Sequence, residues 1–336
     1  MIDFRYHLVS LISVFLALAV GVVLGAGPLQ NSLGTALNDQ VTQLRQDRQA
    51  MQTRLETIDQ AVNERDSYIA QAAAAMLPGT LSGQKVALVR LPEVDDQDVD
   101  SLSKQLGDAG AEVVGQVALT TAWTDPGKDS YRSTYAGQLA AYLPGLSLSS
   151  GNSVLGAALG KALTSQGEEA STLMDLLTAT KEPLVTVETQ PASPATMVVV
   201  LGPRAQEQPV APTAPATPGN DPGQWVLAVH GLSTKAPAVV LGEAATPTGL
   251  VSLLRKEQTP VSTVDSVGQV SASVSTALAL AAVSRGSVQH YGFDKGADSV
   301  MPEVPPVPVP LVPAVPASPG EDPGAGTQPA DAQTEG

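Results

Sequence analysis

The chain has 336 residues, a net charge of -15 at pH 7 and a pI near 4.5. This acidity argues against nucleic acid as a partner and against tight binding to anionic lipid headgroups, because both need clustered lysines and arginines. There is no cysteine, which excludes thiolate chemistry, and only 3% of the residues are aromatic, so stacking platforms for bases or sugars are scarce.

An uncharged stretch runs from Leu8 to Ala26 near the amino terminus. Its 19 residues, at about 1.5 Å each, nearly cross a hydrocarbon core of roughly 30 Å. We therefore expect residues 8–27 to form one transmembrane anchor. A cleaved signal peptide is the alternative, but its basic n-region would here contain Asp3 as well as Arg5.

The orientation of this anchor follows from the few charges that flank it. Arg5 lies before the span, and the first arginines after it are Arg45 and Arg48. The rule that positive charge stays inside favours residues 1–7 as a cytoplasmic tail. We expect the bulk of the chain to lie outside the cytoplasmic membrane, in the periplasm or cell wall space.

Residues 28–78 carry a heptad pattern that ends at Pro78-Gly79. With Val41 at position a, ten of the twelve a and d positions are apolar across six heptads, which predicts a coiled coil. We call these positions the α-helical seam; they are Leu37, Val41, Leu44, Arg48, Met51, Leu55, Ile58, Val62, Arg65, Ile69, Ala72 and Met76. Such a helix would be roughly 70 Å long and would hold the following domain away from the membrane.

The heptad pattern leaves three alternatives for what packs against the seam. Arg54 at position g and Asp59 at the next e can pair across a parallel homodimer. The seam arginines Arg48 and Arg65 would cost stability but could fix the register or select a second membrane protein with a matching helix. A lone helix that leans on its own domain is the third alternative.

Residues 79–301 alternate between strand and helix patterns, which predicts an extracytoplasmic α/β domain with a mainly parallel sheet and helices on both faces. The expected strands are Lys85–Arg90, Glu112–Leu119, Thr196–Leu201, Trp225–Val229, Ala238–Leu241 and Val261–Val264. The expected helices are Val99–Ala109, Tyr135–Tyr142, Gly156–Leu163, Ser171–Thr180, Thr248–Lys256 and Gly268–Ser284.

Two segments have compositions that do not build a core. Residues 203–223 are rich in proline and predict a mobile surface insertion. Residues 302–336 are acidic, contain many prolines and no lysine or arginine, and predict a disordered tail with polyproline II character. The tail could act as a spacer in contact with the cell wall or as a docking peptide.

The sequence contains no recognisable catalytic constellation, so we expect no catalytic residues and no cofactor or metal site. His230 and His290 are the best remaining candidates for a wall-directed enzyme, but no G-x-S-x-G elbow accompanies them. The acidic run Glu93, Asp95, Asp96, Asp98 and Asp100 does not match an EF-hand and is expected to be a solvated loop. The helix start at Thr246-Pro247 could hold an anion, although a capped helix is the simpler interpretation.

The amino-terminal run MIDFRYHLVSLISVFLALAVGVVLGAGPL, the heptad helix and the later segments VVLGE and HYG resemble the MctB family of actinobacterial envelope proteins. The resemblance implies one of two roles. Mycobacterial members are described as envelope proteins of copper transport. Corynebacterial SteB-type members are described as acting with the membrane protein SteA in cell separation and in the regulation of peptidoglycan hydrolases. Copper as a bound metal is implied only by this resemblance.

The residues themselves favour the second role. A single span encloses no pore, and clustered Met or His ligands for copper are absent from the sequence. An anchor, an oligomerising helix and a raised α/β domain are typical of a scaffold. We therefore expect a non-enzymatic scaffold or regulator in a wall-remodelling or cell-separation complex, with copper export as the alternative.

Overall fold

The computed structural model describes residues 4–26, 28–146, 148, 150–179, 182–205 and 222–305. Two helices lead the chain: α1 (Phe4–Ala26) and α2 (Pro28–Met76). Phe4–Val23, with a mean hydropathy of 2.3, is long and apolar enough to cross a membrane, and its side chains are not buried by the rest of the protein. The prediction of one N-terminal apolar helix compatible with a single span is therefore confirmed.

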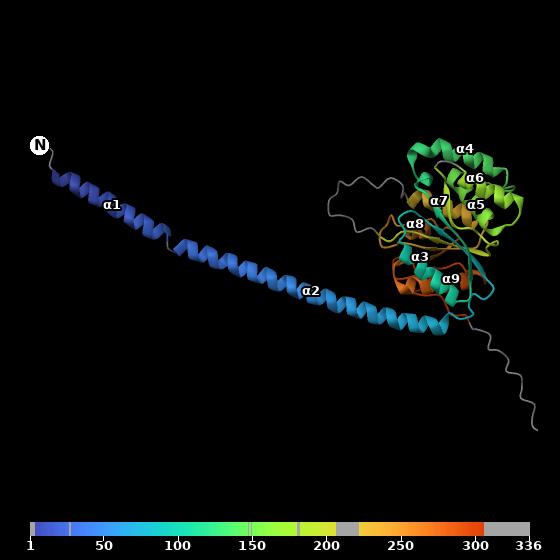
Figure 1. Ribbon diagram of the computed structural model, residues 1–336, viewed down its shortest axis with the longest axis horizontal. Coiled ribbons are helices and arrows are strands. Elements are labelled where there is room, and N and C mark those ends of the chain that lie inside the picture. Colours follow the sequence, from blue (N-terminus) through green and yellow to red (C-terminus); the bar gives the residue numbers. More distant parts are fainter. Residues whose placement is uncertain are drawn as a thin grey trace, which may run out of the picture.

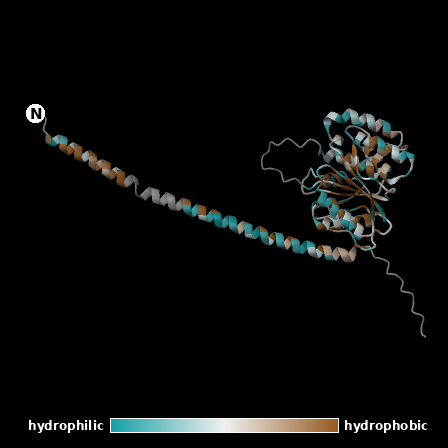
Figure 2. Cartoon of the chain, in the orientation of Figure 1, coloured by the Kyte–Doolittle hydropathy of each residue, from teal (hydrophilic) through white to brown (hydrophobic). Residues whose placement is uncertain are grey.

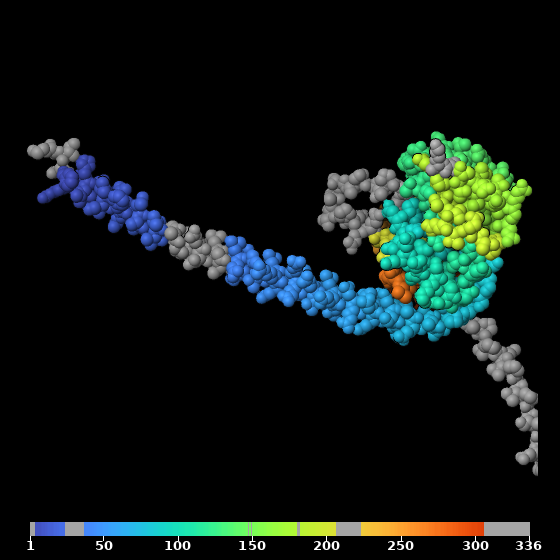
Figure 3. Space-filling view, in the orientation of Figure 1, coloured from blue at the N-terminus to red at the C-terminus, as the bar shows by residue number. Residues whose placement is uncertain are grey.

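Helix α2 extends away from the α/β domain, which we call the head (Figure 1 and Figure 3). Its 49 residues correspond to about 73 Å of helix. Apolar residues dominate α1, whereas α2 is mostly hydrophilic with scattered apolar positions (Figure 2). The helix ends before Pro78 and Gly79, where a glycine φ of +83° takes the chain out of the helical conformation.

The head contains one sheet with strand order β3-β2-β1-β4-β5-β6-β7. All neighbouring strands are parallel except β2 and β3. The strands are β1 (Lys85–Arg90), β2 (Glu112–Leu119), β3 (Val185–Thr189), β4 (Met197–Leu201), β5 (Ala238–Leu241), β6 (Ser262–Val264) and β7 (His290–Tyr291). The order of the central parallel strands, β2-β1-β4-β5-β6, is that of a doubly wound sheet. The chain adds strands toward one edge up to β2 and toward the other edge from β4 onward, so the strand order reverses between β1 and β4.

Helices cover both faces of this sheet (Figure 1), as predicted. Helices α3 and α9 pack together on one face, and α5 packs against α4, α6 and α7 on the other. The helices of the head are α3 (Asp96–Asp108), α4 (Asp129–Ala140), α5 (Gly151–Thr164), α6 (Glu168–Thr178), α7 (Pro222–Ser233), α8 (Leu250–Lys256) and α9 (Val270–Val283), with short 3-10 turns at Thr121–Trp123 and Pro126–Lys128. Strands β1 and β4 lie between the two helical layers, and most of their residues are buried.

The predicted strand at Trp225–Val229 is wrong, because these residues belong to helix α7. Their apolar run is too short to separate a buried strand from a buried helix. Trp225, Val229 and Leu232 are all buried, and this spacing of three and four residues matches one face of a helix. His230 therefore lies on a helix rather than at a strand end.

Two edge strands were missed, and several helices begin earlier than predicted. Strand β3 buries Val185 but leaves most of its other residues at least partly exposed, so it lacks an apolar run. Strand β7 has only two residues, fewer than any periodicity can reveal.

Residues 206–221 of the proline-rich insertion and 306–336 of the tail lie outside the described residues, so the disorder expected there stays a prediction.

Helices α5 and α7 approach so closely that only glycine fits between them. A Cβ on Gly156 would overlap the carbonyl oxygen of Ala228, and a Cβ on Gly231 would overlap that of Ser153. A Cβ on Gly160 would lie 2.9 Å from the carbonyl oxygen of Leu232. These glycines therefore set the distance between the two helices that cover this face of the sheet.

Candidate functional site

The seam of α2 is an apolar stripe that the chain itself leaves largely uncovered. Seven large apolar side chains between Leu37 and Val62 are 36% to 67% exposed. They are Leu37, Val41, Leu44, Met51, Leu55, Ile58 and Val62. Because soluble surfaces rarely carry such a long apolar stripe, interrupted here only by Arg48, it is a candidate site for protein–protein contact.

The last heptad of the seam has a different environment. Ile69 packs against the hydrophobic core of the head, and Ala72 and Met76 are half-buried. The neighbouring Ala73 and Leu77 are buried, and the carboxyl end of α2 lies against α9. The expected twelve-position seam is thus divided, with nine exposed positions up to Arg65 and three that turn toward the head.

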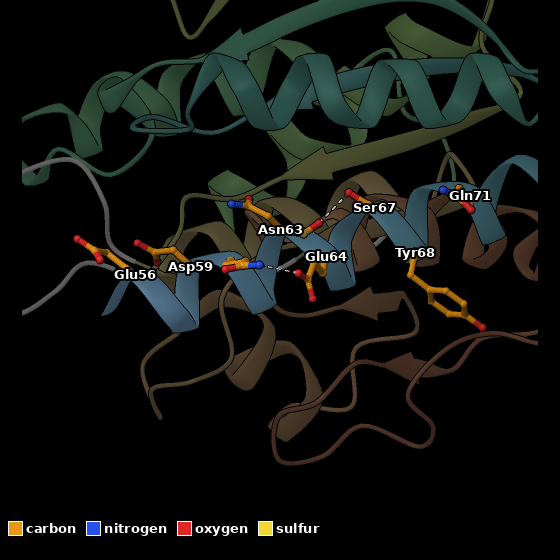
Figure 4. Close-up of a pocket in the computed structure, with 8 residues that line it drawn as sticks. Glu56, Asp59, Asn63, Glu64, Ser67, Tyr68 and Gln71 are labelled. Carbon is orange, nitrogen blue, oxygen red and sulfur yellow. Dashed lines mark hydrogen bonds between the residues drawn. The ribbon is translucent and has the colours of Figure 1, made fainter. Parts of the chain in front are cut away.

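The surface of α2 outside the seam is mostly polar. A shallow groove there is lined by Glu56, Asp59, Gln60, Asn63, Glu64, Ser67, Tyr68 and Gln71 (Figure 4). The side chain of Gln60 donates a hydrogen bond to Glu64 at 2.9 Å, and Ser67 Oγ donates to the Asn63 carbonyl at 2.8 Å. Helix α2 is therefore amphipathic over the length that stands clear of the head, with one face suited to water and the other to a partner helix.

Most of the acidic run at the start of α3 is exposed to solvent, as we expected, but its second half belongs to the helix rather than to a loop, and Asp98 is buried. Asp98 is 6% exposed and holds Arg204 through two hydrogen bonds of 2.8 Å. Asp96 pairs with Arg90 at 2.8 Å, and the Asp95 side chain caps α3 by accepting from the amide of Gln97. These carboxylates thus make structural contacts at the point where the strand order reverses between β1 and β4. The Arg204 side chain lies against Gly268 at the same place.

A buried ion pair holds the carboxyl end of β6. Arg255 Nη1 lies 3.0 Å from Asp265 Oδ2, with side-chain exposures of 5% and 0%. The carboxylate also accepts from the amides of Phe293 and Asp294, while Arg255 Nη2 donates to the Tyr291 carbonyl at 2.9 Å. Every charge in this cluster is hydrogen-bonded, so the pair fastens the loop after β7 to the sheet.

An open pocket of about 450 Å³ lies beside this cluster and includes the second candidate histidine. Its lining includes His290, Arg255, Lys256 and Lys295. The position expected for an anion at Thr246 is taken by the chain's own Glu243, whose carboxylate accepts from the Thr246 amide and hydroxyl. The capped helix that we expected here does not form, because α8 begins at Leu250 and its N-cap residue, Gly249, has no side chain that could cap it.

The imidazole of His290 gives the head a dependence on pH. Burial lowers the pKa of His290 below its ordinary value of 6.5, while Asp298 opposes this shift and Arg255 adds to it. The unfolded chain therefore binds a proton more readily, and the head should lose stability as the pH falls below about 6.5. The midpoint temperature of thermal unfolding should be lower at pH 5.5 than at pH 7.5. The substitution His290→Gln should make this difference smaller, whereas His230→Gln should leave the difference unchanged. An unchanged fall in the His290 variant would contradict this assignment.

Metal-ligating side chains are dispersed within the described part of the chain. No group of three or more histidine, aspartate or glutamate side chains is placed there to hold an ion. Among the methionines, Met174 and Met197 are buried in the core, whereas Met51 and Met301 are exposed.

Sequence reasoning missed the Arg255–Asp265 and Asp98–Arg204 pairs. A signal for the first exists, because Asp265 directly follows the buried strand β6, where a lone carboxylate needs a partner. For the second, Arg204 follows β4 and Asp98 lies in the first turn of α3, and only the order of the strands brings them together.

Comparisons with known proteins add a family assignment to this geometry. The sequence model of the family described as "Copper transport outer membrane protein, MctB" matches residues 1–302. The protein named "Copper transporter MctB" from Mycobacterium tuberculosis strain H37Rv is 33% identical over 120 residues, which are 36% of this chain and 38% of that protein. Its namesake from Mycobacterium leprae is 31% identical over 177 residues, 52% of each chain. The matched regions thus span about half or less of these relatives.

Proposed function

The chain belongs to the MctB family, and from this we propose that it takes part in copper handling in the cell envelope as a membrane-anchored subunit that assembles through α2. The relatives in this family are named copper transporters, and the family description names transport rather than catalysis. These comparisons favour the copper alternative over the cell-separation role that the sequence pattern alone suggested.

The observation that carries the mechanism is the exposed seam of α2. A helix that leaves seven large apolar side chains in water gains stability when a partner helix covers them. The anchor α1 precedes this seam directly, so assembly would occur next to the membrane and place the heads about one helix length away from it. In this proposal the chain contributes assembly and position, and copper is the cargo of the assembled complex.

For the location, we propose the cytoplasmic membrane, with the amino terminus inside and the head outside. The support for a single span is the length and hydropathy of Phe4–Val23. Arg5, near the amino-terminal end of this helix, supports the orientation.

Cell separation is the second candidate function, and the same seam favours it. A raised head on an oligomerising stalk is a suitable design for a regulator that positions wall hydrolases or binds a second membrane protein. The two functions differ in what the cell loses when the chain is removed.

The test is the growth of a strain that lacks this chain across a copper series, with microscopy of the same cultures. We expect growth to fail at lower copper than in the parent strain while the cells separate normally. Chained cells with unchanged copper tolerance would contradict the copper proposal and support the second candidate.

A further inference from the structure

We propose that the exposed part of the seam, from Leu37 to Arg65, is covered by a second copy of this chain in a parallel, in-register coiled coil. The two seam arginines are then neutralised by aspartates of the second copy. This inference rests on the proposed assembly through α2 and identifies the partner.

The apolar layers match themselves. In a parallel in-register pair, each a residue faces the same a residue and each d residue faces the same d residue. Leu55 would therefore meet Leu55, and Ile58 would meet Ile58. All seven apolar positions of the exposed seam carry medium to large side chains. When each residue packs against the same residue of the second copy, no cavity forms in these layers and no polar side chain faces an apolar one.

The seam arginines each have an aspartate next to them in the sequence, on the correct side. A residue at position a inserts between side chains that include the partner's g, and a residue at d inserts between side chains that include the partner's e. Arg48 is at a, and Asp47 is at g; Arg65 is at d, and Asp66 is at e. Each arginine of one copy would thus lie beside an aspartate of the other.

The structure already places one of these carboxylates at the edge of the seam. Asp66 Oδ1 lies 3.5 Å from Arg65 Nη2 of the same chain, and the Arg65 side chain is 54% exposed. In the dimer two arginines and two aspartates would form one layer of balanced charge, which lowers the cost of placing arginine in the seam.

The residues that flank the seam agree with this register. In a parallel pair, each g residue lies near the e residue five positions later in the other copy. Arg54 then meets Asp59 with opposite charge, and no pair along the exposed seam has like charges. The remaining pairs are Gln40 with Arg45, Asp47 with Gln52, and Ala61 with Asp66.

Other arrangements fit less well. A slip of one heptad places Asp47 opposite Asp59 and sets Arg48 against Leu55. An antiparallel pair would require the two anchors to lie at opposite ends of the stalk, although both copies enter the same membrane. Equal distances from the membrane instead bring equal positions of α2 to the same height.

The absence of cysteine from the native sequence makes the register directly measurable. Two single variants of the full chain, Leu55→Cys and Ile58→Cys, would be oxidised under mild conditions in membranes. Both should form a disulfide-linked dimer, because facing a and d positions come within disulfide distance only in this register. Asn63→Cys, on the polar face of the same helix, is the matched control and should remain a monomer.

A second measurement tests the charge pairing. Asp66→Arg should weaken self-association about tenfold, which corresponds to about 1.4 kcal/mol, and the exchange Arg65→Asp with Asp66→Arg should restore it. Failure of both seam cysteines to link, or equal linking of the control, would overturn the proposal. A wild-type chain that is monomeric alone but binds a different helical protein would also overturn it, while copper-sensitive growth of the deletion strain would still support the proposed function.

Discussion

Replacing Leu55 and Ile58 with aspartate is expected to abolish assembly of the chain and leave the head folded. Both side chains are about half exposed in the single chain, at 59% and 48%, and both lie in the middle of the seam. Full burial of an exposed side chain of this size contributes about 1.5–3 kcal/mol. Because only about half of each side chain remains to be buried, the loss of four in a dimer amounts to at least about 3 kcal/mol. The added carboxylates would also have to give up water. Association should weaken by about two orders of magnitude or more.

The measurement is the mass of the purified full-length chain in detergent, with circular dichroism to follow the fold of the head. The matched control is Gln60→Asp with Asn63→Asp, which changes the charge by the same amount on the polar face of the same helical turns. The control should assemble as the wild type does. An assembly of unchanged mass in the seam variant would show that α2 is not the interface.

Replacing Gly231 with alanine is expected to destabilise the head strongly. The added methyl group would overlap the backbone carbonyl oxygen of Ser153 in α5. Backbone cannot rotate away as a side chain can, so helices α5 and α7 would have to separate, and the sheet beneath them would lose packing. We expect a loss of about 3 kcal/mol, which is the upper range for overpacking a core.

Gly137→Ala in α4 is the control for this substitution. No atom lies within 4 Å of the position of its Cβ, so alanine there should stabilise the helix by about 0.5–1 kcal/mol. Urea unfolding of both variants would compare the two effects. A Gly231 variant as stable as the wild type would contradict the close approach of α5 and α7.

The parts of the fold that the sequence predicts are those with local signals. The unit β1-α3-β2 follows from an apolar run, an amphipathic segment and a second apolar run, and the parallel pairing of its strands is confirmed. The extent of α2 from Pro28 to Met76 is likewise close to the predicted segment. These signals are strong because each repeats along the chain.

The parts that failed depend on contacts between distant residues. Trp225–Val229 is helical because α7 must lie against α5, where Gly231 and Gly156 allow close approach. Nothing within the run of apolar residues carries that information. Strand β3 forms because β2 offers it a free edge, although its own residues are mostly polar.

The same contrast holds for the candidate site. The heptad pattern identified the seven large aliphatic side chains of α2 between Leu37 and Val62 that remain exposed, because the pattern is local. That Ile69 instead packs on the head depends on the path of the chain after Gly79, and the buried pair Arg255–Asp265 depends on the position of α8 over β6. Both follow from tertiary packing, which the spacing of residues does not encode.

One complementation measurement tests assembly on α2 and copper handling together. The strain that lacks this chain would carry either the wild type, the Leu55→Asp/Ile58→Asp variant or the polar-face control, and growth would be followed across a copper series. We expect that the wild type and the control restore copper tolerance and that the seam variant, present at equal abundance, does not. Full restoration by the seam variant would contradict the claim that the chain works through assembly on α2.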